Sequence, residues 1–442
     1  MKKICILLVS CLFWLCSSGQ GTAYIKKSNV QGYSQIIRQW KTCPWAWGTG
    51  VHAVYYTDAV LNVKGFVGVT DIYNNFKYTQ ITDNLTIRDM EVLDDMAYLC
   101  GHTSTGHAFI GWIDLSTLSG STNIFEMNAN IGTSVWMSSL ENIVAYYDAY
   151  GNPCVTGYGI TPSGYYGVEY NVSTNQATLG DLPYTPHDVT VTNNYVVYTG
   201  TLSGSDIVIH PIPKTGTFIY PYLPFYLYQV GSTTVSEPFA RLHITSTGGD
   251  GVATISYRLE GSEYGLILRE FDLSGAFSIY DVPMQSSTLV KLNYSATAIF
   301  DFRYDSISKR FAVFHNYEVT PSFYHDAVTK MDYSNGVPSS VQSDYLAITN
   351  QTMASMSLSD SSMYVVYGYD TISKENVFWK ESLPTSVTGT CLYSDVLNVI
   401  SVLHLIEGAR HDAHYGNTPN LLTSPSTINC RGAGDNIVPV CH

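Results

Sequence analysis

The chain has 442 residues, and 13% of them are charged, against about a quarter in ordinary soluble domains. Its formal net charge of −14 argues against nucleic acid as a partner, because binding phosphate requires a basic surface. Tyrosine and glycine each occur 35 times, a composition that favours strands joined by tight turns over helices.

Residues 1 to 19 have the pattern of a secretory signal peptide. Lys2 and Lys3 precede an apolar run from Ile4 to Leu15, and small residues follow. The run is too short to span a bilayer, which takes roughly 20 residues of helix. We therefore expect export to the periplasm, cell surface or medium, with no membrane span. Acylation of Cys16 is the alternative, although the residues before it are larger than the usual acylation motif has.

Six cysteines remain after the predicted signal peptide. An even number permits disulfides in an oxidising compartment, and Cys430 with Cys441 is the most plausible local pair. Cys100 and Cys154 lie in strand-like runs, where they are either further disulfide partners or buried free thiols.

A hairpin recurs along the chain. Residues 89 to 101 and 188 to 200 align without a gap, each with an alternating strand, a turn of two Asp or Asn residues and a second strand that ends on glycine. A third copy runs from 355 to 368, with its turn at Asp360. Asp and Asn suit such turns because they tolerate the left-handed backbone region.

Three looser copies follow the same plan, and the first strand of each of the six carries an equivalent apolar residue, at Met90, Val135, Val189, Leu242, Phe300 and Met356. Successive markers are 45 to 58 residues apart, which is room for four short strands, or one propeller blade. Residues 30 to 85 supply one more blade. The segment from 387 to 405 is expected to complete the first or last blade, or to form an eighth.

The sequence thus predicts an all-β fold with a single β-propeller of about seven four-stranded blades, with six or eight also compatible. The domain is expected to span residues 20 to 442, with a C-terminal tail from about 406. Two or three β-sandwich domains are the competing architecture, but no linker divides the chain. The hairpin pattern resembles that of secreted bacterial propellers with WD40-like, kelch-like or NHL-like blades. This resemblance implies the fold and export, and leaves the activity open.

Three aspartates, Asp89, Asp188 and Asp301, fall near the start of the first strand of a repeat, where blades converge on the axis. They either form a ring that binds a cation or bond the backbone of a neighbouring blade, and the second interpretation is favoured. His102 and His107 flank a loop between two strands. They either line the entrance of a central channel or belong to an ordinary polar loop, and the second interpretation is favoured.

The cluster from His411 to His414 has two histidines at a spacing that suits a metal ion on a helix. Nearby glycines favour a solvated loop instead, and we predict no metal and no cofactor.

The segment from 217 to 230 concentrates aromatic rings around Pro221 and Pro224. Proline disfavours regular strand pairing, so the segment is predicted to be a stiffened loop. Tyr222, Phe225 and Tyr226 are its predicted ligand-binding residues, at least partly exposed, because tyrosine and its relatives are frequent at interfaces.

The function predicted from these features is an exported, monomeric, non-enzymatic binding or scaffold propeller that recognises a glycan or protein through loops on one face. The alternative is a secreted propeller hydrolase or lyase that acts on polysaccharide. That alternative requires carboxylates or histidines to converge in one pocket.

Overall fold

The structure is a computed structural model. It describes residues 24–28, 37–45, 51–58, 65–70, 76–81, 85–118, 122–126, 128–130, 134–202, 206–214, 222–229, 239–244, 250–260, 263–274, 284–294, 298–305, 310–320, 323–334, 337–346, 351–359, 363–370, 376–382, 392–401, 409–414, 418–420, 426–428, 430–435 and 437–441. Side chains are described for part of these, mostly between residues 85 and 345. The predicted signal peptide lies outside the described residues.

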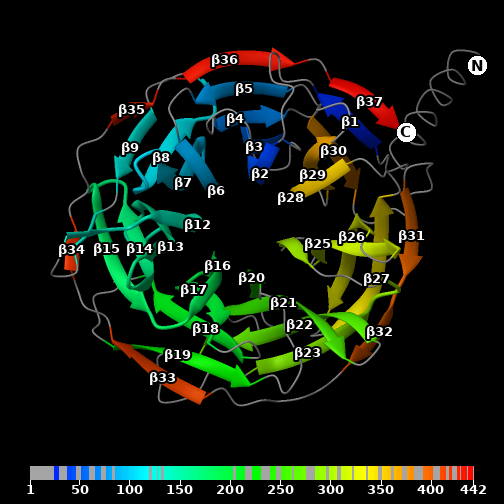
Figure 1. Ribbon diagram of the computed structural model, residues 1–442. Coiled ribbons are helices and arrows are strands. Elements are labelled where there is room, and N and C mark those ends of the chain that lie inside the picture. Colours follow the sequence, from blue (N-terminus) through cyan, green and yellow to red (C-terminus); the bar gives the residue numbers. More distant parts are fainter. Residues whose placement is uncertain are drawn as a thin grey trace, which may run out of the picture.

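Seven five-stranded antiparallel sheets are arranged as blades around a common axis (Figure 1). The predicted all-β single propeller is therefore confirmed. The first four strands of blade 1 are β2 (Ile37–Trp45), β3 (Val51–Asp58), β4 (Gly65–Thr70) and β5 (Phe76–Ile81). Those of blade 2 are β6 (Leu85–Leu93), β7 (Met96–Thr103), β8 (Ala108–Asp114) and β9 (Thr122–Glu126). Those of blade 3 are β12 (Ser139–Tyr147), β13 (Pro153–Thr161), β14 (Gly164–Asn171) and β15 (Gln176–Leu182). A separate hairpin, β10 (Asn128–Asn130) with β11 (Ser134–Trp136), lies between blades 2 and 3 in the sequence.

Blades 4 to 6 repeat the same plan, and blade 7 joins both ends of the chain. Blade 4 has β16 (Thr185–Val191), β17 (Tyr195–Thr201), β18 (Asp206–Pro213) and β19 (Tyr222–Gln229), and blade 5 has β20 (Phe239–Ile244), β21 (Asp250–Glu260), β22 (Glu263–Asp272) and β23 (Met284–Lys291). Blade 6 has β24 (Ile299–Asp305), β25 (Arg310–Thr320), β26 (Phe323–Ser334) and β27 (Val337–Leu346). Blade 7 has β28 (Gln351–Ser359), β29 (Met363–Asp370), β30 (Asn376–Ser382) and β1 (Tyr24–Ser28). The ring is thus closed by β1, which pairs with β30.

A fifth strand on each blade comes from the C-terminal part of the chain, here called the belt, residues 392 to 441. In chain order its strands cover blades 6, 5, 4, 3, 2, 1 and 7: β31 (Leu392–Val396), β32 (Asn398–Ser401), β33 (Ala409–His414), β34 (Thr418–Asn420), β35 (Ser426–Ile428), β36 (Cys430–Asp435) and β37 (Ile437–Cys441). The expectation that residues 387 to 405 complete the first or last blade or form an eighth is wrong, since β31 and β32 add to blades 6 and 5. The segment expected as a tail from about 406 supplies β33 to β37.

The reverse order of the belt follows from sheet twist. Twist turns the outermost strands until they run along the circumference of the ring (Figure 1). Every belt strand is antiparallel to the fourth strand of its blade. A chain that runs against all the fourth strands must circle the ring in the opposite sense and so meets the blades in reverse order.

The predicted hairpins occupy equivalent places, as the first two strands of blades 2, 4 and 7. Met90 faces Leu99, Val189 faces Tyr198 and Met356 faces Val366. The turn between β6 and β7 places Asp94 at a φ of 52°, in the left-handed region expected for it. Asn193 lies in the matching turn between β16 and β17, whereas Asp360 lies outside the described residues.

Steric crowding explains why glycine stands at the end of these hairpins. The first strand of blade 2 bulges between Ile87 and Asp89, and Gly101 faces Ile87 across the pair. Gly101 has a φ of +152°, and a Cβ there would overlap the carbonyl oxygen of Thr86. The bulge therefore brings two backbones closer than any side chain permits.

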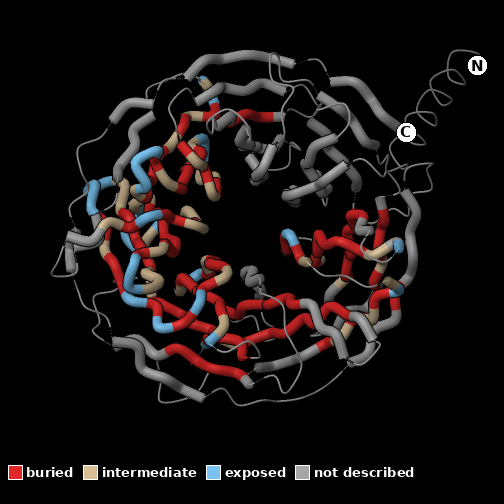
Figure 2. The backbone as a smooth tube through the Cα atoms, in the orientation of Figure 1, coloured by how far each residue is buried: buried red, intermediate tan, exposed pale blue. Residues whose placement is uncertain are grey.

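The apolar core lies between adjacent blades. One cluster joins Tyr146 and Cys154 of blade 3 to Val189 and Val208 of blade 4, and another joins blades 2 and 3. Figure 2 shows buried residues running along the described middle strands, with exposed residues at turns. The largest fully buried side chains include Tyr170, Tyr198, Tyr226, Tyr228 and Tyr345, so much of the tyrosine excess fills the space within and between sheets.

Candidate functional site in the central channel

The predicted aromatic binding loop is wrong, because Tyr222–Gln229 forms strand β19 between β18 and β33. Phe225 is 5% exposed and Tyr226 is fully buried, so neither ring is available to stack on a ligand; the side chain of Tyr222 lies outside the described set. Proline is tolerated because β19 pairs with β18 only from Tyr226 onward, which leaves Pro224 paired on one side, with the belt.

A cavity of about 260 Å³ lies among the innermost strands of four blades. It is lined by Glu91, Asn142, Ile143, Val144, Ala145, Tyr146, Asp188, Val189, Thr190, Val191 and Arg303. These residues come from β6, β12, β16 and β24, which lie as far as 212 positions apart in sequence (Glu91 to Arg303) yet meet at the axis. We define this space as the channel cavity.

The aspartates of the innermost strands accept hydrogen bonds from backbone N–H groups. Asp89 is 3% exposed, and its Oδ2 accepts a hydrogen bond of 2.9 Å from the backbone N–H of Ile143 in blade 3. The carboxylate of Asp188 accepts from the N–H of Val189 at 3.0 Å. The interpretation that such an aspartate bonds the neighbouring blade is confirmed for Asp89.

Arg303 is the cation of the channel cavity. Its Nη2 lies 3.1 Å from Oδ2 of Asp301, whose Oδ1 accepts from the N–H of Phe302. The ion pair positions the guanidinium, and the same cavity is lined by Glu91 and Asn142 from blades 2 and 3. A fixed guanidinium offers several N–H donors in one plane, the geometry that carboxylates and hydroxyl pairs accept.

The first strands of blades 2, 3, 4 and 6, which are the innermost strands of the ring (Figure 1), each contain a bulge, and the bulged residues are polar or aromatic. The bulges place Arg88 and Glu141 on adjacent blades, with Arg88 Nε 3.6 Å from Glu141 Oε2. His187 occupies the bulge of blade 4, where its Nε2 lies 3.0 Å from Thr201 Oγ1. Phe300 occupies the bulge of blade 6 and is 36% exposed. We call these four residues the channel mouth.

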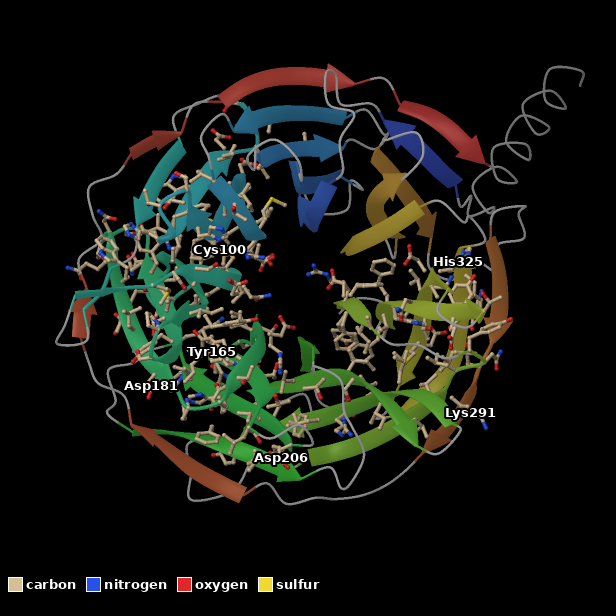
Figure 3. All side chains as sticks on the ribbon, in the orientation of Figure 1. Cys100, Tyr165, Asp181, Asp206, Lys291 and His325 are labelled. Carbon is tan, nitrogen blue, oxygen red and sulfur yellow. The ribbon has the colours of Figure 1, made fainter. Side chains whose placement is uncertain are left out.

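His102 and His107 flank the turn between β7 and β8 as predicted. Burial, and then the charge of Arg88, lower the pKa of His102, which keeps the ring neutral near pH 7. The Nδ1 atom of His102 is buried and has no hydrogen-bond partner. The ring of His107 stacks on Trp136 at 4.2 Å, so it closes the turn onto the β10–β11 hairpin. Figure 3 places Cys100, from the same strand as His102, and Tyr165 on one side of the ring, opposite His325.

Two buried ionisable groups are not among the residues that line the channel cavity. Glu169, in the packing between blades 3 and 4, accepts a hydrogen bond of 2.8 Å from Tyr146, while its second oxygen, Oε2, is buried without a partner. Burial raises the pKa of Glu169 to about 7. In blade 6, His315 is 1% exposed, and burial lowers its pKa to about 4. Its Nδ1 must donate to the carbonyl of Asn316, so Nε2 accepts from the hydroxyl of Thr329.

Among side chains the structure describes, no group of three or more His, Cys, Asp or Glu is placed to hold a metal ion. Residues His411 to His414 lie on strand β33, so the helical spacing considered for a metal site does not occur; their side chains are outside the described set. Cys100 and Cys154 are buried and form no disulfide, whereas the thiols of Cys430 and Cys441 are not described. The described part of the chain contains no helix with the length and apolarity to cross a membrane.

Fold and site together define a seven-bladed propeller whose blades are each completed by a strand of a C-terminal belt. Comparison of the chain with protein-family models and with curated proteins gave no match. The geometry of the channel therefore carries the functional argument.

Of the residues that line the channel cavity, Asp188 was singled out from the sequence, as one of three aspartates near the axis; the other lining residues and the channel mouth were not predicted as a site. The usable signal was the hairpin itself: the residue before each repeat aspartate, Arg88 or His187, is the bulged one. Which bulged residues meet depends on blade geometry, and no local pattern in the sequence encodes that.

Proposed function

We propose that this protein is an exported binding propeller that recognises a glycan through the channel mouth and the channel cavity. The observation that supports the proposal most directly is the convergence of Arg303, Glu91 and Asn142, from three blades, on one cavity. Charged and amide groups of this kind form paired hydrogen bonds with sugar hydroxyls. The exposed ring of Phe300 adds an apolar surface for the face of a sugar.

Binding is tested with an oligosaccharide array probed by the purified chain. Arg303→Gln should weaken binding to any captured glycan at least tenfold. Arg310→Gln is the matched control, since Arg310 is also paired with an aspartate, Asp332, in the same blade but does not line the channel cavity. Equal loss in both variants, or no loss in Arg303→Gln, would contradict the proposal.

Export is the second part of the proposal, and it rests on the N-terminal sequence pattern. N-terminal sequencing of the secreted material should give a start near Gly19 or Gln20. An intact Met1 would contradict export, and a lipid-modified Cys16 would contradict the predicted start but not export.

A hydrolase or lyase is the second candidate, because two carboxylates, Glu91 and Asp188, line the same cavity. Carbohydrate hydrolysis uses such a pair across the scissile bond. If a captured glycan is cleaved, Glu91→Gln should abolish product formation while it leaves capture measurable. A glycan that is bound and recovered intact favours the binding role.

A further inference from the structure

The belt makes backbone pairs with every blade. It contributes between three and six residue pairs to each, with the fewest at β34 and β35 and the most at β33 and β36. Its last strand, β37, pairs with β1, the strand that closes the ring. Both closing elements therefore lie in the sheet of blade 7, and β1 has a partner on each side.

The edges that the belt covers are built without it. Each belongs to the fourth strand of a blade, and that strand is already paired on its inner side with the third strand, as β5 is with β4 and β19 with β18. A fourth strand without its belt partner is an open sheet edge with unpaired N–H and C=O groups, which accepts any extended chain of the right direction.

Along the chain, ring and belt are connected by the nine residues between Ser382 and Leu392. Beyond β31, the residues paired across the belt edge are far apart in sequence: β36 pairs with β5 at a separation of about 350 residues, since Cys430 faces Ile81. Contacts that close such long loops form late in folding, after the blades supply the edges. A belt that docks last can be supplied by another copy of the chain.

We propose that the outer rim of the ring is a strand-accepting surface that binds either its own belt or the belt of a second copy of this chain. The same backbone pairs form in either case, and they circle the ring in the same sense. Exchange of belts between copies is then limited by the rate at which a belt leaves, and it requires no unfolding of the blades.

The test uses the full chain with a specific protease site placed between Ser382 and Leu392. The intact protein is folded, cut, and incubated with an excess of a fluorescently labelled 392–442 polypeptide in urea below the unfolding midpoint. Size-exclusion chromatography should then show the label migrating with the ring at one belt per ring. Removal of the belt should give larger species that return to single rings when belt polypeptide is added back.

The matched control carries the same protease site in the turn between β12 and β13, at Tyr150, which is 81% exposed. Cutting there nicks blade 3 but leaves the belt attached, so the ring should take up far less label. Two results would overturn the proposal. One is no incorporation of label at any urea concentration that leaves the ring folded. The other is loss of the belt and unfolding of the ring in a single transition, which would make the belt an inseparable part of the core.

Discussion

The inner and outer edges of the ring leave strand edges in need of cover, and the molecule protects them differently. At the axis, the first strands bulge, and buried aspartates such as Asp89 tie one blade to the next. At the rim, a separate stretch of chain pairs with every fourth strand. The inner solution is local in sequence and depends on particular side chains, whereas the outer solution is remote in sequence and is made by backbone pairs. Substitutions should therefore be most damaging at the axis and mildest at the rim.

The largest expected effect is at the inner hairpin. Gly101→Ala places a Cβ against the carbonyl of Thr86, so we expect a loss of about 3 kcal/mol or more in the free energy of unfolding, measured by urea denaturation. Gly106→Ala is the control, because Gly106 also has a positive φ, +78°, but open space around it. It should cost about 1 kcal/mol. Equal costs would show that the backbone angle matters and the close approach does not.

The free energy of unfolding should depend on pH through Glu169, which lies in the packing between blades 3 and 4. Since the pKa of Glu169 is raised from 4.5 to about 7, the unfolded state ionises first, and stability is lost as pH rises through this window. The full loss is about 3 kcal/mol. Glu169→Gln should therefore be more stable than the parent at pH 8 by up to that amount and equal to it at pH 4.5.

His315 gives the opposite slope. Its pKa is lowered from 6.5 to about 4, so the unfolded state takes up the proton first, and stability is lost as pH falls through this window. The two groups partly cancel in the parent protein between pH 4.5 and 6.5. The free energy of unfolding of the Glu169→Gln variant should accordingly fall more steeply than that of the parent as the pH decreases from 6.5 to 4.5. A variant that differs from the parent by the same amount at both pH values would rule out titration of Glu169 as the cause.

The sequence predicted the propeller and its hairpins because each repeat encodes its own turn and its own alternation, as at Asp94 and Met90. The belt could not be predicted, because strands such as β34 and β35 are three residues long and their partners are hundreds of residues away. The error at Phe225 and Tyr226 has the same origin. Two prolines argued against strand pairing, and no local sequence pattern indicates that a belt strand pairs with this segment.

Intermediate effects should come from the ties between blades. Asp89→Ala leaves the buried N–H of Ile143 without its acceptor, at a cost of about 1–3 kcal/mol. Asp181→Ala is the control. Asp181 is an exposed strand residue whose carboxylate bonds the backbone of its neighbour Leu182, and Figure 3 shows it on the outer part of blade 3. Its loss should stay within about 0.5 kcal/mol. A larger effect at Asp181 would mean that cohesion between blades does not depend on the axis.

The smallest effect on stability is expected at the end of the belt. Ending the chain after Asp435 removes β37 and its four residue pairs with β1, and it leaves β1 held by β30 alone. Each backbone bond contributes about 0.5–1.5 kcal/mol, but about 1–2 kcal/mol of chain entropy per residue is recovered when the strand is no longer ordered. The net change should be about 1 kcal/mol, small compared with that at Gly101. The consequence should appear in association: with one edge open, the shortened chain should form dimers in light scattering at concentrations where the parent is a single ring. A shortened chain that stays a single ring but loses several kcal/mol would reverse the comparison, because it would place the main stabilisation of the ring at its outer clasp.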